Sequence, residues 1–485
     1  MIRAAKLAIL ASAIAFPLSG CATRSDESGG LASMPRPVLE AMAAAQDDRA
    51  KNVILFIGDG MGISTVTAAR IYDGQKRGES GEENVLPFEK FDNVALVKTY
   101  NVNAQVPDSA GTASAMHTGI KTNIGMLGIG PDAPRGDCRV GEQYHLPLLG
   151  EEVKAKGLAL GIVSTARITH ATPASVYARS VDRDWEADSA VPDDQNGFGC
   201  RDIARQLVES DWDVALGGGL GAFYGSEKGG RRRNAADDLP AAWKARTGGT
   251  FVTTGQELSA APSDRPVLGL FSPSHMTYMA ERLAPGAAKS SEPTLTTMTA
   301  EAIERLGADP DGYYLMVESG RIDHGHHASK AGFALEEAVE FAKAIQYAVE
   351  NTDPDDTLIL VTADHSHVFT IAGYPQRGND ILGVVVPPAG GGEDDEGGEG
   401  PTLAKDGQPY TTLGYGNGPG AVTGDRGTPE TGVMATQQSL VPLGSETHGG
   451  EDVALYAQGP GAERARGVIE QNRIYDIIRA AFGWN

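Results

Sequence analysis

The sequence predicts an α/β protein with a large, mainly parallel central sheet and helices on both faces. Short apolar runs typical of buried strands alternate with segments whose apolar residues recur every three or four positions, as in helices. Such alternation predicts parallel strands joined by helices that cover the sheet. Helical patterns lie between these runs, for example one that ends near Tyr72 and one over 334–349. Six runs are predicted as strands: 52–57, 158–164, 213–216, 313–317, 357–361 and 452–456.

The length and net charge of the chain limit the kinds of partner and domain organisation that it can have. The chain has 485 residues and a formal net charge of −23, because 64 acidic side chains outnumber 41 basic ones. This excess argues against a nucleic-acid partner, since phosphate contacts along nucleic acid need Lys and Arg. It does not exclude a small phosphate substrate, because bound metal ions reverse the local field. We expect residues 51–485 to form one large domain, with no apolar run long enough to span a bilayer.

The N-terminus predicts export. Residues 1–20 combine a short basic region with an apolar stretch, which is typical of a signal peptide. The following Leu18-Ser19-Gly20-Cys21 resembles a lipobox, which implies cleavage before Cys21 and acylation of that residue. Several acyl chains hold a protein stably on a membrane. We therefore expect a periplasmic or cell-surface protein, anchored to the outer membrane through Cys21 and a tether within 21–50. The alternative is an ordinary cleaved signal with a cysteine there by chance.

Two cysteines remain after the leader, Cys138 and Cys200. Export places them in an oxidising compartment, where two such cysteines usually pair. We expect a disulfide bond, and the alternative is two free buried thiols.

Residues 388–445 are poor in strand and helix signals and rich in Gly, Pro and Thr. They are predicted to be an insertion carried on the main sheet. Within them, residues 390–400 are dominated by Gly, Glu and Asp, with too few apolar side chains to pack. This stretch is predicted to be a mobile, solvated loop.

Candidate metal ligands follow the first and fourth predicted strands. Asp59 lies in a Gly-Asp-Gly turn, where small neighbours let a cation approach. Asp323 and His327 are four residues apart, so on a helix they share one face, and a carboxylate and an imidazole are ordinary zinc ligands. Glu318, at a strand end, offers the hard oxygen that suits Mg²⁺. The alternative for this segment is a solvated charged turn.

Further candidates lie after the fifth predicted strand and before the sixth. Asp364 and His365 are adjacent, His367 follows, and His448 precedes the last strand. In an extended chain Asp364 points away from the two histidines, so all three meet one cluster only if the chain turns. Two or three metal ions of mixed type would account for six of the ten histidines lying in these segments, and two metals about 4 Å apart are standard for displacement at phosphorus. The six are His324, His326, His327, His365, His367 and His448.

Ser109 is the candidate nucleophile. It lies in a run of small residues that is predicted to be a turn entering a helix, where amides and the helix dipole favour an anion. A serine hydroxyl needs a base or a metal to become nucleophilic. No GxSxG motif surrounds it, so a hydrolase triad is not predicted. The alternative for Ser109 alone is a helix cap.

Seven motifs together resemble the alkaline phosphatase family, and more closely its vertebrate-type branch than the enteric bacterial one. Their order and spacing fit over most of residues 50–485. The resemblance implies that family's fold and a homodimer. It also implies hydrolysis of small-molecule phosphate monoesters through a phosphoserine, with a broad substrate range and an alkaline optimum. The motifs are NVILFIGDGMG, VPDSAGTASAMHTGIKTN, ITHATPASVYARSVDRDW, ESGRIDHGHH, VTADHSH, YGNGPG and ETHGGEDVALYAQGP.

The resemblance also implies a role for each matching residue. Ser109 would become phosphorylated, and Arg183 would clamp two phosphate oxygens, a task that suits bidentate guanidinium geometry. Cys138 and Cys200 match a family disulfide, and YGNGPG with its neighbours resembles the crown insertion at the dimer interface. The cofactors implied are two Zn²⁺ and one Mg²⁺ per subunit. The ligands would be Asp323, His327 and His448 for the first zinc, Asp59, Asp364 and His365 for the second, and Asp59, Thr172 and Glu318 for magnesium.

Three more histidines would support these ligands. The resemblance places His170 near Thr172, His324 near the first zinc and His367 near the second, where such groups orient ligands. The chain departs from vertebrate relatives at their calcium site, where an acidic residue follows a Leu-Phe pair. Here Ser272 follows Leu270-Phe271, and His275 stands where another acidic residue is usual. These departures argue against a calcium site.

Other classes remain as alternatives. A phosphodiesterase or sulfatase could share the fold, but diesterases of this superfamily usually use threonine and lack the clamping arginine. Sulfatases need a modified Cys or Ser in C/S-x-P-x-R, and Asp-Ser-Ala-Gly-Thr does not match it. A surface lipoprotein that binds phosphate or metal without catalysis is a third possibility, which the intact Ser109, Arg183 and ligand set disfavour.

Overall fold

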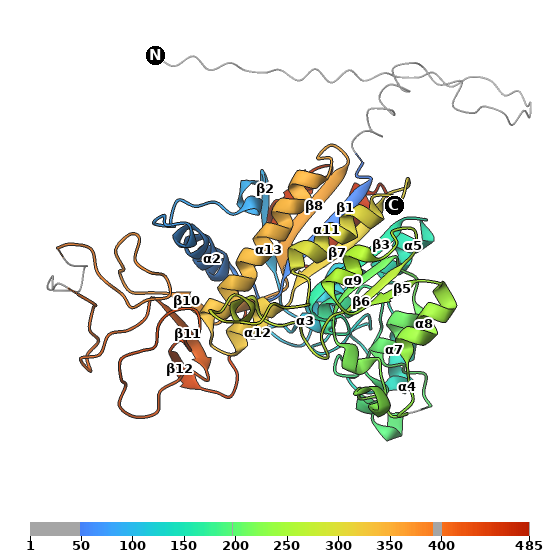
Figure 1. Cartoon of the computed structure of the whole chain (residues 1–485), viewed down its shortest axis with the longest axis horizontal. Coiled ribbons are helices and arrows are strands. Elements are labelled where there is room, and N and C mark those ends of the chain that lie inside the picture. Colours follow the sequence, from blue (N-terminus) through green and yellow to red (C-terminus); the bar gives the residue numbers. More distant parts are fainter. Residues whose placement is uncertain (1–48, 196, 391–399, 485) are drawn as a thin grey trace, which may run out of the picture. The chain divides into compact units, whose positions relative to one another are not determined.

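A ten-stranded sheet runs through the computed structural model, which describes residues 49–195, 197–390 and 400–484 (Figure 1). The strand order is β15-β2-β14-β8-β1-β7-β3-β4-β6-β5. Among these, β14 is antiparallel to both its neighbours, and the other pairings are parallel. The strands are β1 (Asn52–Gly58), β2 (Asn93–Lys98), β3 (Ala159–Arg167), β4 (Val214–Gly218), β5 (Thr250–Val252), β6 (Val267–Leu270), β7 (Tyr313–Ser319), β8 (Thr357–Ala363), β14 (Val453–Gln458) and β15 (Gly467–Glu470).

The predicted fold class is confirmed, and each of the six predicted strands lies on a strand of this sheet. The central strands β7 and β8 are buried along their whole length, which requires cover on both faces. Four strands were not predicted, namely β2, β5, β6 and β15. In β2 buried and exposed residues alternate, and the other three span only three or four residues.

Two groups of helices cover the sheet. The long helix α13 contacts α2, α11 and β1, while α3 contacts α5, α6 and α14. Figure 1 shows α2, α11 and α13 together over the near face. The predicted helices correspond to α2 and α13. The first group is α2 (Ile63–Lys76), α11 (Leu295–Leu306) and α13 (Ala331–Asn351); the second is α3 (Ser109–Thr118), α5 (Leu149–Ala155), α6 (Ala171–Ala174) and α14 (Arg473–Ala481).

The remaining elements are shorter. A two-stranded sheet joins β9 (Ser366–His367) to β13 (His448–Gly449). A three-stranded sheet is formed by β10 (Phe369–Ile371), β11 (Leu413–Gly418) and β12 (Ser439–Pro442), so two of its strands lie within the predicted insertion. The other helices are α4 (Cys138–Gly141), α7 (Ile203–Glu209), α8 (Leu239–Thr247), α9 (Gly255–Ala260), α10 (Met279–Arg282) and α12 (Arg321–His327).

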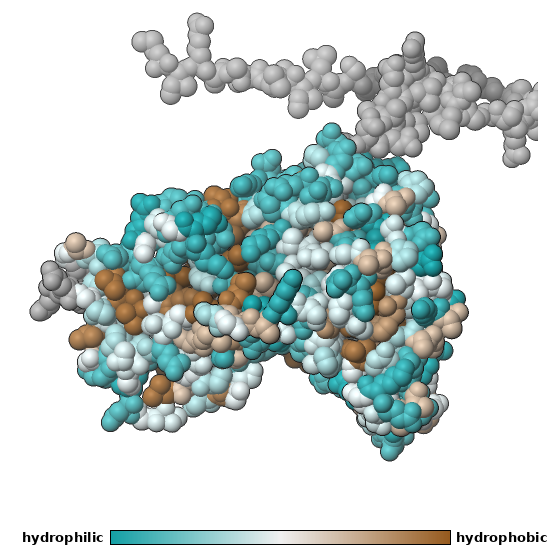
Figure 2. Space-filling model, viewed as in Figure 1, coloured by the Kyte–Doolittle hydropathy of each residue, from teal (hydrophilic) through white to brown (hydrophobic). Residues whose placement is uncertain are grey.

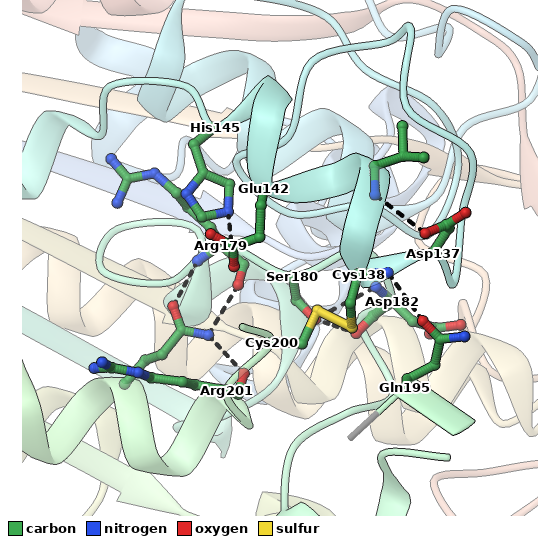
Figure 3. The surroundings of a disulfide bond; sticks show 12 residues. Asp137, Cys138, Glu142, His145, Arg179, Ser180, Asp182, Gln195, Cys200 and Arg201 are labelled. Atoms are coloured by element: carbon green, nitrogen blue, oxygen red, sulfur yellow. Dashed lines mark hydrogen bonds and ion pairs between the residues drawn. A yellow bond between two sulfur atoms is a disulfide. The ribbon is translucent and has the colours of Figure 1, made fainter. Parts of the chain in front are cut away.

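The predicted disulfide between Cys138 and Cys200 is present, and it closes a 62-residue separation. Figure 3 shows how Gln195 and Asp137 fix the chain around it. Gln195 Oε1 accepts the amide of Cys138 at 3.0 Å, and the carboxylate of Asp137 caps α4. Cys138 also packs in a small apolar cluster apart from the main core. The bond therefore joins the first residue of α4 to a loop residue before α7, and neither segment belongs to the sheet.

Several predictions fall outside the described residues: the signal peptide, Cys21 with its lipid anchor, nearly all of the tether and most of the acidic loop. Within the part of the chain that is described, no helix combines the length and apolar character needed to cross a bilayer.

Candidate active site and metal centre

The predicted ligands meet at the carboxyl ends of four neighbouring strands. The sheet order places β8, β1, β7 and β3 side by side, and ligands bind at this edge in open parallel sheets. Gly58 pairs with Ala363 on one side and with Ser319 on the other. Asp59 and Asp364, each the next residue, therefore leave adjacent strands together.

The residues predicted for the second zinc lie together. The donor atoms of Asp59, Asp364 and His365 are all within 4.8 Å of one another. His365 Nε2 is 3.4 Å from Asp59 Oδ1 and 3.3 Å from Asp364 Oδ2. The chain turns after β8, and the Gly60 amide holds Asp364 Oδ1 at 2.9 Å. This turn brings Asp364 and His365 to one cluster.

The residues predicted for the first zinc also lie together. Asp323 and His327 are one turn apart on α12, with Asp323 Oδ1 3.2 Å from His327 Nε2 and 3.4 Å from His448 Nε2. His327 Nδ1 faces the carbonyl of Glu446 at 2.6 Å, and His448 Nδ1 faces that of Pro107 at 2.8 Å. These carbonyls fix the tautomers by accepting the Nδ1 protons, so both Nε2 lone pairs remain for a cation.

Two of the three residues predicted for magnesium, Asp59 and Glu318, lie together beside His170. The donor atoms of Asp59, Glu318 and His170 are within 4.8 Å of one another. Ser164, paired with Glu318 across β3 and β7, hydrogen-bonds to Glu318 Oε2. Thr172, in α6, is fully buried.

The donor set fits divalent cations. One side-chain oxygen on each of five predicted ligands is buried with no hydrogen-bond partner among the described residues, where such atoms are normally paired. Burial and then the neighbouring carboxylate of Asp364 raise the pKa of Asp59 well above its usual value. Burial likewise raises the pKa of Glu318 to about 7. Bound cations supply the missing partner charge. The five oxygens are Asp59 Oδ2, Thr172 Oγ1, Glu318 Oε1, Asp323 Oδ1 and Asp364 Oδ2.

Ser109 is the first residue of α3, with its hydroxyl turned toward the second ligand set. Its Oγ lies 3.1 Å from His365 Nε2 and 3.5 Å from Asp59 Oδ1. The helix cap is the neighbouring residue, because Asp108 Oδ1 accepts the Gly111 amide. The alternative of Ser109 as the cap is therefore wrong.

The guanidinium of Arg183 is held at the site by Asp108. Its Nη1 donates to Asp108 Oδ2 at 3.0 Å, and its Nη2 lies 3.1 Å from His170 Nε2. Burial would raise the pKa of Asp108, but Arg183 and the amides of Gly125 and Gly111 outweigh it and lower that pKa. Asp108 thus caps α3 and fixes Arg183 next to Ser109, a role that the sequence did not reveal.

Glu446 is a second residue that sequence reasoning missed. Its buried carboxylate holds His367 Nδ1 at 2.5 Å and the Val368 amide at 2.8 Å. His367 Nε2 in turn faces Asp323 Oδ1 at 3.0 Å, outside hydrogen-bonding geometry. Burial would lower the pKa of His367, but Asp323 and Glu446 raise it to about 9. His367 therefore lies against the first ligand set as well as near His365.

A cavity of about 340 Å³ opens onto these groups. Ser109, Arg183 and His324 contribute to its wall together with ligands of the first set. The ring of His324 lies beside those of His170 and His275. The cavity is large enough for a phosphate group whose ester substituent extends to solvent.

Comparison with known proteins gives a consistent result. The alkaline phosphatase family profile matches residues 50–483. The chain is 44% identical over 449 residues to the tissue-nonspecific alkaline phosphatase of Gallus gallus, covering 88% of this chain and 83% of the relative. It is 43% identical over 450 residues to the alkaline phosphatase of Gadus morhua, covering 88% and 90%.

Solved structures agree. The alkaline phosphatase of the Antarctic bacterium TAB5 superposes with a TM-score of 0.62 at 25% identity, covering 90% of this chain and 99% of that one. The Thermus thermophilus enzyme, at 23% identity, shares the fold with a TM-score of 0.64 over 93% of this chain and 96% of its own. The chain therefore belongs to the alkaline phosphatase family, whose members are metal-dependent enzymes, and it hydrolyses phosphate monoesters.

Proposed function

We propose that Ser109 is the nucleophile and that the reaction passes through phosphoserine at this position. The observation that carries the proposal is the direction of its hydroxyl, which faces His365 and Asp59 from the first residue of α3. Ser109 Oγ attacks phosphorus in line, and the bond to the ester oxygen breaks. Water then attacks phosphoserine and releases inorganic phosphate, while the alcohol has already departed.

The ligand sets are proposed to hold two Zn²⁺ and one Mg²⁺, as the resemblance implies. The first zinc would lie between Asp323, His327 and His448, the second between Asp59, Asp364 and His365, and magnesium near Asp59, Thr172 and Glu318. When bound, these ions supply positive charge for the serine alkoxide, the departing oxygen and the attacking water. The protein contributes a fixed set of carboxylates and correctly protonated imidazoles.

Arg183 is proposed to bind two nonbridging phosphate oxygens. Asp108 holds one end of the guanidinium, so little side-chain freedom is lost on binding, and a loose transition state needs this positioning more than covalent help. The contacts are confined to the phosphate, so the substrate range is broad. A solved TAB5 variant carries Mg in the site called M3, which supports a magnesium site in this chain.

One assay tests the proposal. Wild type and Ser109→Ala are compared on p-nitrophenyl phosphate, bis-p-nitrophenyl phosphate and p-nitrophenyl sulfate. We expect wild type to prefer the monoester and the variant to lose that activity. Equal monoester rates for the two proteins would contradict the nucleophile, and preference for the diester or the sulfate would favour the alternative enzymes on this fold. No turnover of any ester by the fully metallated protein would favour a non-catalytic binding protein.

We also propose a homodimer formed through the region around β12. Leu440, Val441 and Leu443 are 82%, 48% and 43% exposed, and hydrophobic side chains gather on the part of the molecule that carries β10 to β12 (Figure 2). Exposed apolar patches of this kind mark interaction surfaces. Sedimentation should give a dimer for wild type and a monomer for Leu440→Asp/Val441→Asp; a monomeric wild type would contradict the proposal.

Finally, we propose that the protein is exported and held on the outer membrane by acyl chains on Cys21. The support is the lipobox-like Leu18-Ser19-Gly20-Cys21. Wild type should fractionate with membranes and Cys21→Ser should be soluble after export. A soluble wild type would contradict the anchor without affecting the catalytic proposal.

A further inference from the structure

Three imidazoles converge beside the cavity that contains Ser109, and two of them, His170 and His324, line it. His170 lies between β3 and α6, His275 follows β6, and His324 is in α12, so they come from separate parts of the chain. One nitrogen of each lies within 4.8 Å of the others. The ring centroids are 4.1 Å apart for His275 and His324, 5.3 Å for His170 and His275, and 5.5 Å for His170 and His324.

Two of these rings have nitrogen atoms that form no hydrogen bond with the described residues and could bind a metal ion. His324 Nδ1 and His170 Nδ1 are both buried without a hydrogen-bond partner within the described ranges, which is unusual for buried polar atoms. His170 Nε2 faces Arg183, as described above. Both nitrogens of His275 face N–H groups of Arg167, one from the backbone at 3.2 Å and one from the guanidinium. A neutral imidazole has one acceptor lone pair, so one of the two contacts to His275 is not a hydrogen bond.

Two of the three nearby arginines are paired with carboxylates, and the third, Arg321, lies over the ring of Tyr278. Arg167 donates to both carboxylate oxygens of Glu186 at 2.6–3.0 Å, and Arg183 is paired with Asp108 at 3.0 Å. Each keeps its carboxylate partner if its histidine contact is given up. A cation among the three imidazoles therefore does not face two bare positive charges.

We propose that His170, His275 and His324 form a fourth metal site, which binds Zn²⁺ or a similar transition-metal ion. Three imidazoles with an open fourth position are an established zinc ligand set, with Zn–N distances of about 2.0–2.1 Å. Imidazole selects such ions over Mg²⁺ or Ca²⁺, which prefer oxygen. His170 and His324 line the cavity that holds Ser109, so the fourth position is open to phosphate or water.

Binding requires local adjustment. Tetrahedral zinc places its ligand nitrogens about 3.4 Å apart, closer than the 4.8 Å within which they lie here. Small rotations of the three rings close this gap, and His275 turns one nitrogen away from Arg167. The proposal goes beyond the proposed function, because none of the predicted catalytic metal ligands belongs to this site.

Metal counting tests the site. Wild type, His275→Ala and His145→Ala are equilibrated with Zn²⁺ and Mg²⁺, freed of unbound metal and analysed by mass spectrometry. His145 is a control imidazole near the disulfide (Figure 3), outside every candidate metal group of the described residues. We expect His275→Ala to hold one zinc ion per chain fewer than wild type, and His145→Ala to match wild type. Equal zinc in wild type and His275→Ala would overturn the proposal.

A second variant guards against misfolding. If circular dichroism shows that His275→Ala does not fold, His324→Gln is titrated with Co²⁺ beside wild type. We expect one fewer cobalt ion with a tetrahedral visible spectrum in the variant, and identical titrations would overturn the site. Failure here is distinct from failure of the proposed function, because loss of activity in Ser109→Ala does not depend on this metal count.

Discussion

Two acidic clusters in this molecule differ in how their charge is balanced. Around Arg232, which is 4% exposed, Asp202 accepts two guanidinium bonds at 2.8 and 3.0 Å, Asp237 accepts one at 3.0 Å, and Asp188 lies 3.3 Å away. At the carboxyl edge of the sheet, Asp59, Glu318 and Asp364 are fully buried. Each has an oxygen without a hydrogen-bond partner among the described residues.

The difference separates a structural cluster from a functional one. Burying a carboxylate is costly unless it is paired. The arginine-centred cluster is paired within the chain and needs nothing from solution. The carboxylates proposed as metal ligands have oxygens with no such partner among the described residues, and divalent cations would supply it. This unmet charge, more than the count of acidic residues, distinguishes the proposed active site.

The largest expected effect comes from removing the metals. Exhaustive chelation should lower monoester hydrolysis by a factor on the order of 10³ or more, because the cations stabilise charge that develops in the transition state. Adding Zn²⁺ and Mg²⁺ back should restore the rate, measured with p-nitrophenyl phosphate. Full activity in protein with no detectable metal would remove the distinction between the two clusters.

Arg232→Met should destabilise the fold by about 3–5 kcal/mol, because it leaves the buried carboxylate of Asp202 without its cation. The matched control is Arg473→Met, since Arg473 is 62% exposed where it pairs with Asp476; surface pairs of this kind contribute about 0–1 kcal/mol. Urea unfolding measures both, and the Arg232 effect should persist whether or not chelator is present. A small effect of Arg232→Met would contradict the structural assignment of this cluster.

Glu446→Gln should weaken zinc binding about 10–100-fold, because groups that orient metal ligands typically contribute this much. The Glu446 carboxylate holds His367 against Asp323, and the Glu446 backbone carbonyl accepts a hydrogen bond from His327 Nδ1. Competition with a zinc indicator measures the affinity. Glu451→Gln is the control, since Glu451 contacts Ser366 in the same two-stranded region. Equal affinities for the two variants would refute the role of Glu446.

The buried carboxylate of Glu337 lies outside both clusters, and we expect its substitution to have a smaller effect on stability than Arg232→Met. Glu337, on α13, accepts only the Met279 amide among the described side-chain contacts, and burial raises its pKa to about 7. Because this pKa lies above its unfolded value, the stability contributed by its bound proton is present below about pH 4.5 and is lost as the pH rises through 7.

Glu337→Gln should therefore be more favourable at pH 8 than at pH 5 by about 2–3 kcal/mol, because the buried carboxyl must ionise at pH 8 and stays largely protonated at pH 5, whereas the amide's own contacts are the same at both pH values. Urea unfolding at both pH values measures the difference. Glu350→Gln, on an exposed part of the same helix, should show no such change. A Glu337→Gln effect that is identical at the two pH values would contradict the assigned pKa.

Much of the sheet could be predicted because β1, β7 and β8 are continuous apolar runs. Strand β2 was missed because it alternates between buried and exposed residues, and β5 because three residues give no period. Most candidate ligands were found since they follow a strand or share a helix face with another ligand, whereas His448 precedes a strand and Thr172 was named only through the resemblance. All of these predictions apart from Thr172 use only residues that are close together in the sequence.

What could not be predicted depends on contacts between distant segments. Glu446 reaches His367 because β9 and β13 pair antiparallel, with His448 opposite His367, and a lone Glu before His448 carries no such signal. Asp108 is part of a recognised motif, yet the hydrogen bond that it accepts from Arg183 joins residues 75 positions apart in the sequence. His275 was noticed as a departure at an expected calcium site, but its position beside His170 and His324 required the fold.

The proposed phosphoserine is tested by acid-quenched trapping, read by mass spectrometry of the peptide that contains Ser109. We expect phosphate on Ser109 in metal-loaded protein mixed with a monoester, and none in chelated protein or in Ser109→Ala. Phosphate on a different residue, or equal labelling of Ser109 with and without metal, would contradict it.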